Sequence, residues 1–277
     1  MELEFSILLG DVDSVRRILN TNKGLINRCM DYGTPLHFAV YYGHTDVVIE
    51  LLENGATQML NSDGETPLIL AANKGFASIV GVLLDDNNAG IDIQNPMSGD
   101  TALHYAVGNG HIDVVIELLF RGAKQMVNCA RITPLIIAVD RGYTLIVEVL
   151  LDNCCVGINI QNLSSGDTAL HQAAGRGHEL IVKKLLGKGA QCDIQNRSGY
   201  TPLRHACQEG YQDIVDMLLN NGASPEVPDF NGFYPIHTAA QNDRSLTMNI
   251  LLKYGCDPNT VSILLCVQSC THAQIRI

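Results

Sequence analysis

Apolar residues recur along this chain at helical intervals, and residues 101–119, TALHYAVGNGHIDVVIELL, show the pattern most clearly. Leu103 and Ala106 are three positions apart in the first half of this stretch. In the second half, apolar residues follow at i, i+1, i+4 and i+5 from Val114. Because such spacing gathers apolar side chains on one face of a helix, the stretch predicts two short helices.

The ends of these two helices are also marked in the sequence. Thr101 precedes the first helix, where its hydroxyl can accept a hydrogen bond from a free N–H group of the opening turn. Gly108 and Gly110 separate the helices and supply the backbone freedom that a reversal needs. The result is an antiparallel pair with too little interior to fold alone, so it requires a neighbour on each side.

The same pattern recurs along the chain at a nearly constant spacing. Seven segments share it: Thr34-Pro-Leu-His, Thr66-Pro-Leu-Ile, Thr101-Ala-Leu-His, Thr133-Pro-Leu-Ile, Thr168-Ala-Leu-His, Thr201-Pro-Leu-Arg and Tyr234-Pro-Ile-His. Their starts are separated by 32, 35, 32, 35, 33 and 33 residues. Proline suits the first helical position because the N–H it lacks would have no partner there. Residues 34–100 also align without gaps to residues 101–167, which indicates that two repeats were duplicated together.

This repeat resembles the ankyrin repeat, which has a period of about 33 residues and a T-P-L-H-x-A signature. The resemblance implies an all-α fold, an ankyrin-repeat solenoid of about eight helix-turn-helix units joined by β-hairpin loops. Residues 1–30 fit an atypical first unit with the polar outer face that a solenoid end requires. The predicted domain covers residues 1–259, with units that start near 1, 34, 66, 101, 133, 168, 201 and 234.

Residues 260–277 match no repeat and are mostly apolar. Two interpretations of this tail stay open. It folds back as an improvised C-terminal cap, or the chain is a truncated form of a longer protein.

Composition narrows the classes of function. Charged residues make up 17% of the chain and aromatic residues 5%, with no tryptophan, so the core must be built from Leu, Ile, Val and Ala. A net charge of −11 argues against a nucleic-acid partner, because that affinity depends on Lys and Arg releasing counterions. No window approaches the ~20 apolar residues of a membrane span, and the opening MELEFSILLGD has too short an apolar run for a secretory signal.

Nine cysteines, odd in number and unevenly spaced, do not resemble a disulfide framework. Free thiols in a reducing compartment are the better interpretation. We therefore expect a monomer in the cytoplasm, with the nucleus as the alternative location.

The candidates for chemistry have structural explanations. Seven histidines occupy repeat positions where we expect bonds to neighbouring loop backbone: His37, His104, His171, His237, His44, His111 and His178. Cys266, Cys270 and His272 offer three soft ligands, but a zinc site needs a closed set of four, and only Cys256 could complete it if the tail curled back. The adjacent cysteines at 154 and 155 form either an inert, partly buried pair or an oxidant-sensitive one. The sequence holds no P-loop, G-x-S-x-G or H-E-x-x-H motif, and the repeats leave no segment for a catalytic domain. We expect no enzyme activity, no metal and no cofactor.

The resemblance also implies where a partner would bind. Ankyrin solenoids bind proteins along a concave surface of hairpin tips and first helices, at positions just before each repeat threonine and seven and eight residues after it. The corresponding candidates are Tyr41, Tyr42, Asp63, Glu65, Asn73, Lys74, Asn109, Arg131, Asp140, Arg141, Arg176, Arg197, Tyr200, Gln208, Glu209, Phe230 and Phe233.

Tyrosine and arginine dominate the energy of many interfaces. The sequence thus predicts one aromatic anchor at Tyr41 and Tyr42, and another at Tyr200, Phe230 and Phe233. The alternative is that these rings pack on adjacent hairpin tips.

The preferred hypothesis is a non-catalytic scaffold that holds a protein partner, whose identity the sequence does not give, on the concave face. A rigid stack suits this role because it loses little entropy on binding. A second hypothesis is the substrate-receptor part of a ubiquitin ligase, since SILLCVQSC in the tail bears a faint likeness to a ligase-docking box. An enzyme built on the stray Cys and His residues is the third hypothesis.

Overall fold

The computed structural model describes residues 2–30, 32–86, 90–153 and 157–257, and their regular structure is almost entirely helical. They belong to two compact units, which divide between residues 134 and 135. The first unit holds α1 (Glu2–Leu8), α2 (Val12–Thr21), the short 3₁₀ helix η1 (Lys23–Leu25), α3 (Pro35–Tyr42), α4 (Thr45–Glu53), α5 (Pro67–Lys74), α6 (Ala77–Asp85), α7 (Ala102–Gly108) and α8 (Ile112–Phe120). The second holds α9 (Pro134–Asp140), α10 (Thr144–Asn153), α11 (Ala169–Arg176), α12 (Glu179–Gly187), α13 (Pro202–Glu209), α14 (Gln212–Asn220), α15 (Pro235–Gln241) and α16 (Ser245–Lys253).

Helix α5 shows how the sequence pattern sets the helix ends. At α5, the Thr66 hydroxyl accepts a hydrogen bond from the backbone N–H of Ile69 at 3.1 Å. Pro67 occupies the first helical position, and Gly75, with φ of 80°, ends the helix in the left-handed conformation. That conformation costs glycine little because it has no Cβ. The predicted threonine cap and glycine reversal are confirmed here.

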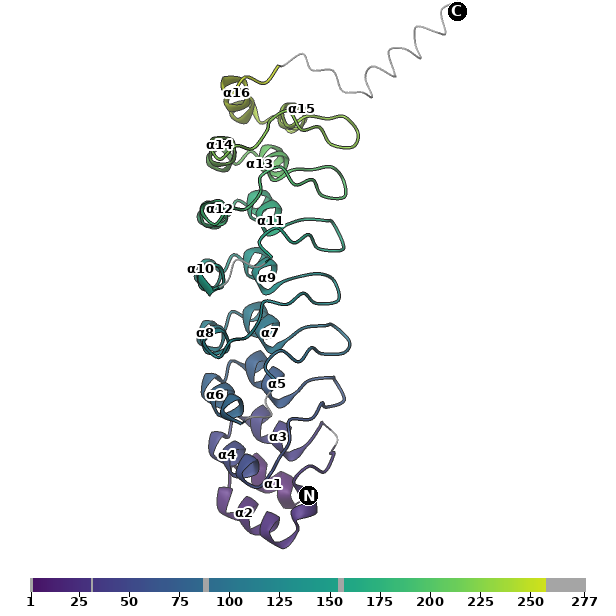
Figure 1. Ribbon diagram of the computed structural model, residues 1–277, viewed down its shortest axis with the longest axis vertical. Helices are drawn as coiled ribbons and strands as arrows, with labels where there is room; N and C mark the ends of the chain where they lie inside the picture. Colours follow the sequence, from purple (N-terminus) through teal and green to yellow (C-terminus); the bar gives the residue numbers. More distant parts are fainter. Residues whose placement is uncertain (1, 31, 87–89, 154–156, 258–277) are drawn as a thin grey trace, which may run out of the picture. The chain divides into compact units, whose positions relative to one another are not determined.

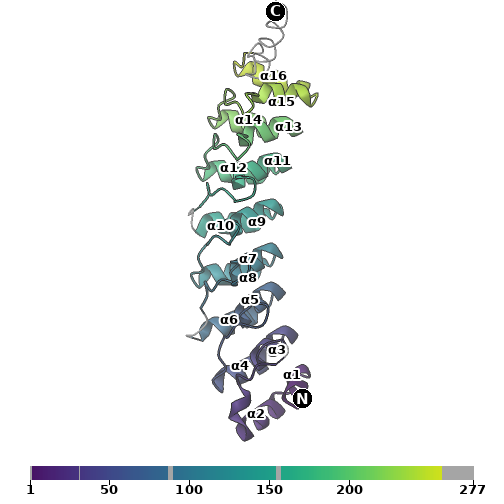
Figure 2. The ribbon, with the colours of Figure 1, turned by 90° about the vertical axis from the view of Figure 1, so that its right-hand side faces the viewer.

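Within each unit the helix pairs stack in two layers. In the first unit α3, α5 and α7 pack in succession, and α4, α6 and α8 form the second layer (Figure 1). In the second unit α11, α13 and α15 pack together, as do α10, α12, α14 and α16 (Figure 2). The core lies between the layers. Val47, Val48 and Leu51 of α4 are fully buried there.

The connecting loops turn as hairpins beside the layer of first helices (Figure 1). Backbone hydrogen bonds close these turns, as in the bonds from the N–H of Asn61 to the carbonyl of Glu65 at 2.9 Å and from the N–H of Gly64 to the carbonyl of Asn61 at 3.1 Å. In the described ranges these hairpins contain no β-strand, and the one isolated β-bridge pairs Met30 with Gly33. The hairpins are therefore held by their turns and not by β-ladders.

Two non-glycine residues adopt the left-handed conformation that other copies give to glycine. Arg131 (φ 54°) stands where Gly64 and Gly199 stand in other hairpins, two residues before the repeat threonine. Asp243 (φ 56°) replaces the glycine that ends the first helix, as Gly75 does in its own copy. Both positions carry backbone strain, because a Cβ is disfavoured at positive φ. The 260–277 tail lies outside the described residues.

Candidate functional site

A groove lined by aromatic residues lies beside the end of α3 in the first unit. Its volume is about 400 Å³. It is lined by Tyr32, His37, Phe38, Tyr41, Tyr42, Asn61, Asp63, Glu65 and Leu70. We call it the aromatic groove. Four of the binding residues predicted from sequence, Tyr41, Tyr42, Asp63 and Glu65, therefore lie around one hollow.

Local structure explains why these side chains reach the groove. Tyr41 and Tyr42 form the last turn of α3, and their side chains are 52% and 42% exposed. The side-chain oxygen of Asn61 accepts hydrogen bonds from the backbone N–H groups of Asp63 (3.0 Å) and Glu65 (2.8 Å). These two hydrogen bonds fix the hairpin in a conformation in which Asp63 and Glu65 both line the groove.

Two further groove residues, Tyr32 and Phe38, escaped the sequence reasoning. Their ring centroids are 6.3 Å apart in an edge-to-face contact, and Tyr32 is 73% exposed. Phe38, four residues after Thr34, lies outside the positions of the family pattern, whereas Tyr32 precedes Thr34 by two residues, as the selected Arg131 precedes Thr133, and was passed over. The clustering of four aromatic residues within residues 32–42 was the signal that could have found them.

His37 forms part of the groove wall as a neutral, hydrogen-bonded ring. Its Nδ1 accepts a bond from the backbone N–H of Thr34 at 3.1 Å, so its Nε2 carries the proton and donates to the carbonyl of Glu65 at 3.1 Å. Burial lowers the pKa of His37. Below the threonine caps, His104 and His171 make the corresponding bonds to the carbonyls of Ile132 and Tyr200. The prediction of bonds to loop backbone is confirmed for these three histidines. His44 and His111 instead lie 3.1 Å from the carbonyls of Leu8 in α1 and Asn73 in α5, and in the described part of the chain Nε2 of His178 has no hydrogen-bond partner.

Lys74 and Asn73, at the end of α5, meet neighbours within the first unit. The Lys74 ammonium lies 4.1 Å from the centroid of the Tyr41 ring, a cation–π contact. Asn109 donates to the side-chain oxygen of Asn73 at 2.8 Å, and His111 lies 3.1 Å from the Asn73 carbonyl. Lys74 thus covers one face of the exposed Tyr41 ring.

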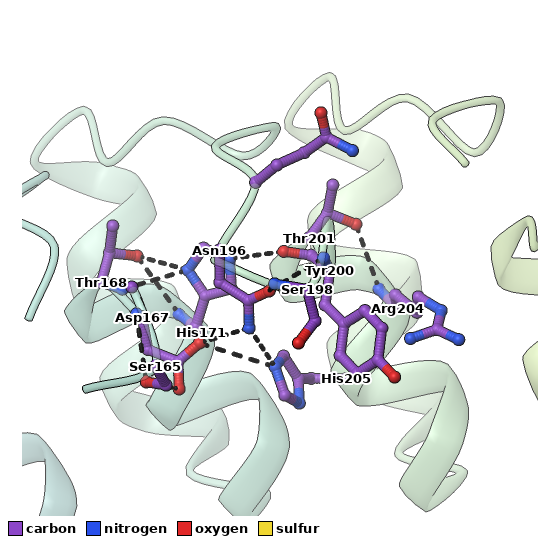
Figure 3. Close-up of polar contacts among 12 residues, drawn as sticks. Ser165, Asp167, Thr168, His171, Asn196, Ser198, Tyr200, Thr201, Arg204 and His205 are labelled. Atoms are coloured by element: carbon purple, nitrogen blue, oxygen red, sulfur yellow. Dashed lines mark hydrogen bonds and ion pairs between the residues drawn. The ribbon is translucent and has the colours of Figure 1, made fainter. Parts of the chain in front are cut away.

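In the second unit, Tyr200 is half-buried under an arginine. The guanidinium of Arg204 lies 3.6 Å from the centroid of the Tyr200 ring. One of its terminal nitrogens is 2.9 Å from a carboxylate oxygen of Asp229, and both side chains are almost fully buried. Arg204 occupies the position that His171 fills in the preceding copy, and Asp229 that of Asn196. Figure 3 shows Tyr200, Arg204 and the neighbouring turn. The Tyr200 ring thus contacts two side chains of α13, Arg204 and His205.

A cluster of Ser165, Asp167, Asn196 and His205 lies beside this ring (Figure 3). The Ser165 hydroxyl donates to Asp167 at 2.6 Å, Asn196 donates to it at 2.7 Å, and the His205 ring is 3.8 Å away. Burial alone would raise the pKa of Asp167, but bonds from His205, Ser165 and Asn196 outweigh it and hold the pKa well below its usual range. So weak a base does not activate a serine. The cluster instead ties two successive hairpins together.

The other predicted residues have varied surroundings. Asp140 and Arg176 form an ion pair between successive first helices of the second unit. Gln208 donates to Glu209 at 3.0 Å, and Phe233 contacts the His237 ring edge-on with centroids 6.3 Å apart. The exposed members are Arg131, Arg141, Arg176, Arg197, Glu209 and Phe230.

The described residues hold no group of three or more His, Cys, Asp or Glu side chains placed to bind a metal ion. The cysteines at 154, 155, 266 and 270, and His272, lie outside the described residues. Five cysteines are described, and all carry free thiols. Burial raises the pKa of Cys256 to about 11 and that of Cys207 further. Both stay protonated at neutral pH, which makes them poor metal ligands and nucleophiles. In the described part of the chain, no helix is long and apolar enough to cross a bilayer.

The stacked helix pairs and their hairpins have counterparts in a known family. A family model described as ankyrin repeats (3 copies) matches residues 3–97, 79–162, 135–229 and 170–262. The chain belongs to the ankyrin-repeat family. Ankyrin repeats are protein–protein interaction modules, typically without catalytic activity of their own.

Several full-length relatives share this region with the ankyrin-repeat chain. The mouse B-cell lymphoma 3 protein homolog is 34% identical over 207 residues, which is 70% of this chain and 45% of the mouse protein. A Caenorhabditis elegans homolog of transient receptor potential cation channel subfamily A member 1 is 32% identical over 69% of this chain and 16% of its own length. The Arabidopsis thaliana protein XBAT31, named as an E3 ubiquitin-protein ligase, is 30% identical over 67% of this chain and 36% of its own length. The chain thus spans less than half of each of these relatives.

Proposed function

We propose that this chain is a non-catalytic binding module that holds a protein partner on the surface formed by its hairpins and first helices. The observation that supports it best is the aromatic groove. Tyr32, Tyr41 and Tyr42 are 73%, 52% and 42% exposed and line one hollow together with Phe38. Exposed aromatic clusters of this kind mark interaction sites, because rings supply large apolar contact area.

The preformed geometry of the groove supports the same role. The hairpin that carries Asp63 and Glu65 is fixed by Asn61, and the N–H of Thr34 and the Glu65 carbonyl hold the His37 ring. A surface that is already ordered loses little conformational entropy when a partner binds. The module therefore acts by presenting a fixed surface.

The ligase hypothesis gains no separate support. The similarity to XBAT31 runs along repeats that this chain also shares with the lymphoma 3 homolog and the channel homolog. These relatives are named for different functions. Similarity along the shared repeats therefore supports protein binding in general and does not favour any one of the named functions.

The test is a comparison of two double variants in the same unit. Y41A/Y42A removes the groove rings, whereas I116A/F120A removes apolar side chains from α8, where Ile116 is 48% and Phe120 81% exposed. Proteins captured by the unaltered chain are identified by mass spectrometry, and the Kd of the purified partner is measured by calorimetry. We expect Y41A/Y42A to weaken binding about thirtyfold, the loss typical of a buried aromatic anchor. The control should bind within about twofold, as neutral contacts do.

Circular dichroism checks that both variants keep their helicity. A partner that binds Y41A/Y42A as tightly as the unaltered chain would show that the aromatic groove is not the binding surface.

A further inference from the structure

The aromatic groove has a charge that narrows the chemistry of its partner. Asp63 and Glu65 line it, and among the described residues neither carboxylate has an ion-pair partner. His37 adds no positive charge near neutral pH, since burial lowers its pKa. Phe38 and Tyr42 also line a neighbouring hollow that includes Glu2. The groove therefore combines exposed ring faces with two carboxylates that form no ion pair with a described residue, and the cation beside it is Lys74 on the Tyr41 ring.

Two contacts within this chain show that aromatic rings, alone or together with a carboxylate, hold cationic side chains. In the second unit, Arg204 lies on the Tyr200 ring at 3.6 Å and reaches the Asp229 carboxylate at 2.9 Å. In the first unit, Lys74 lies on the Tyr41 ring at 4.1 Å. Ring faces attract cations, and carboxylates add to that attraction. The aromatic groove exposes the same two elements without an internal arginine.

We propose that the aromatic groove takes an arginine side chain from a basic segment of the partner protein. The guanidinium stacks on a tyrosine ring of the groove and donates hydrogen bonds to Asp63 or Glu65. Arginine suits this site better than lysine, because its planar guanidinium stacks on a ring while its edge donates to a carboxylate. This inference rests on the proposed function and specifies the partner's chemistry.

The probe is a fluorescein-labelled glycine–serine peptide that carries three arginines, and its binding is followed by fluorescence anisotropy. A second peptide carries citrulline, which has the shape of arginine without its charge. The chain's net charge of −11 attracts any cationic peptide, so matched variants must decide. D63N/E65Q removes two charges at the groove, and D213N/D216N removes two from α14 in the other unit.

We expect D63N/E65Q to weaken binding of the arginine peptide about fivefold, and D213N/D216N less than twofold, at 0.15 M salt. Y32L/Y42L, which leaves the net charge unchanged, should weaken it about threefold or more. K74Q should strengthen binding, because it removes a competing cation beside Tyr41. The citrulline peptide should bind at least fivefold more weakly than the arginine peptide.

Equal losses in D63N/E65Q and D213N/D216N would overturn the inference, and so would a citrulline peptide that binds as tightly as the arginine one. Circular dichroism checks that each variant keeps its helicity, and Y32L/Y42L and D63N/E65Q test the groove independently of each other. If the purified partner requires Tyr41 and Tyr42 while the peptide tests fail, the arginine inference falls and the proposed function stands. If the partner binds Y41A/Y42A as tightly as the unaltered chain, the aromatic groove is not the binding surface, and the arginine inference falls together with that part of the proposed function.

Discussion

The buried pair of Arg204 and Asp229 allows a stringent test of how the repeats are held together. In the preceding copy the same two positions are His171 and Asn196. Asn196 donates its side-chain N–H to Asp167 at 2.7 Å, whereas Asp229 has no such donor and presents a second carboxylate oxygen. An arginine at 204 compensates that charge. The two substitutions should therefore be energetically coupled.

The size of the coupling follows from burial. The Arg204 and Asp229 side chains are 7% and 1% exposed. Among the described residues, the other two guanidinium nitrogens of Arg204 have no hydrogen-bond partner. D229N leaves this guanidinium facing an amide, which should cost about 3 kcal/mol, at the lower end of the range for a broken buried pair. The lower end applies because Tyr200 still stacks on the cation, and because an Asn oxygen can keep the bonds from Asn231 and Phe233.

The assay is a double-mutant cycle in urea. R204H alone leaves an uncompensated carboxylate, although backbone N–H groups solvate it, and should cost about 2 kcal/mol. R204H/D229N recreates the histidine–asparagine combination of the preceding copy, and should be more stable than the sum of the single changes by about 2–3 kcal/mol. Equal m-values across the four proteins would show that the same surface unfolds in each. Additive single effects, within about 0.5 kcal/mol, would refute the coupling.

Two further predictions concern stability. R131G should raise the free energy of unfolding by about 1 kcal/mol because it relieves the positive φ of 54° at Arg131, and an unchanged urea midpoint would contradict this. Stability should fall as pH drops below 6.5 and towards about 4, because burial lowers the pKa of His171 to about 4 while the unfolded chain takes up the proton near 6.5. H171Q removes that group, so its slope of stability against pH over this window should be shallower by up to about 1.4 kcal/mol per pH unit, and an identical slope in urea titrations would exclude His171 as the source.

The sequence by itself determined the fold class, the repeat spacing and the helix ends. These are local properties, because a threonine cap, a proline at the first helical position and a reversal glycine act within a few residues. The histidine positions could also be interpreted from sequence, since each recurs at the same place in its repeat.

Only the tertiary structure decided which predicted residues share a site. Tyr41 and Glu65 are 24 residues apart in the sequence, and their meeting in the aromatic groove depends on how the hairpin folds back beside α3. Tertiary packing likewise places Lys74 on Tyr41 and brings Arg204 to Asp229. It also decides that Tyr200 is half-buried while Tyr41 is exposed, although the family pattern selects both. Local patterns fix helix ends because those interactions span few residues, whereas exposure and charge pairing depend on neighbours that are 24 to 33 residues away in these three pairs, up to one repeat period along the chain.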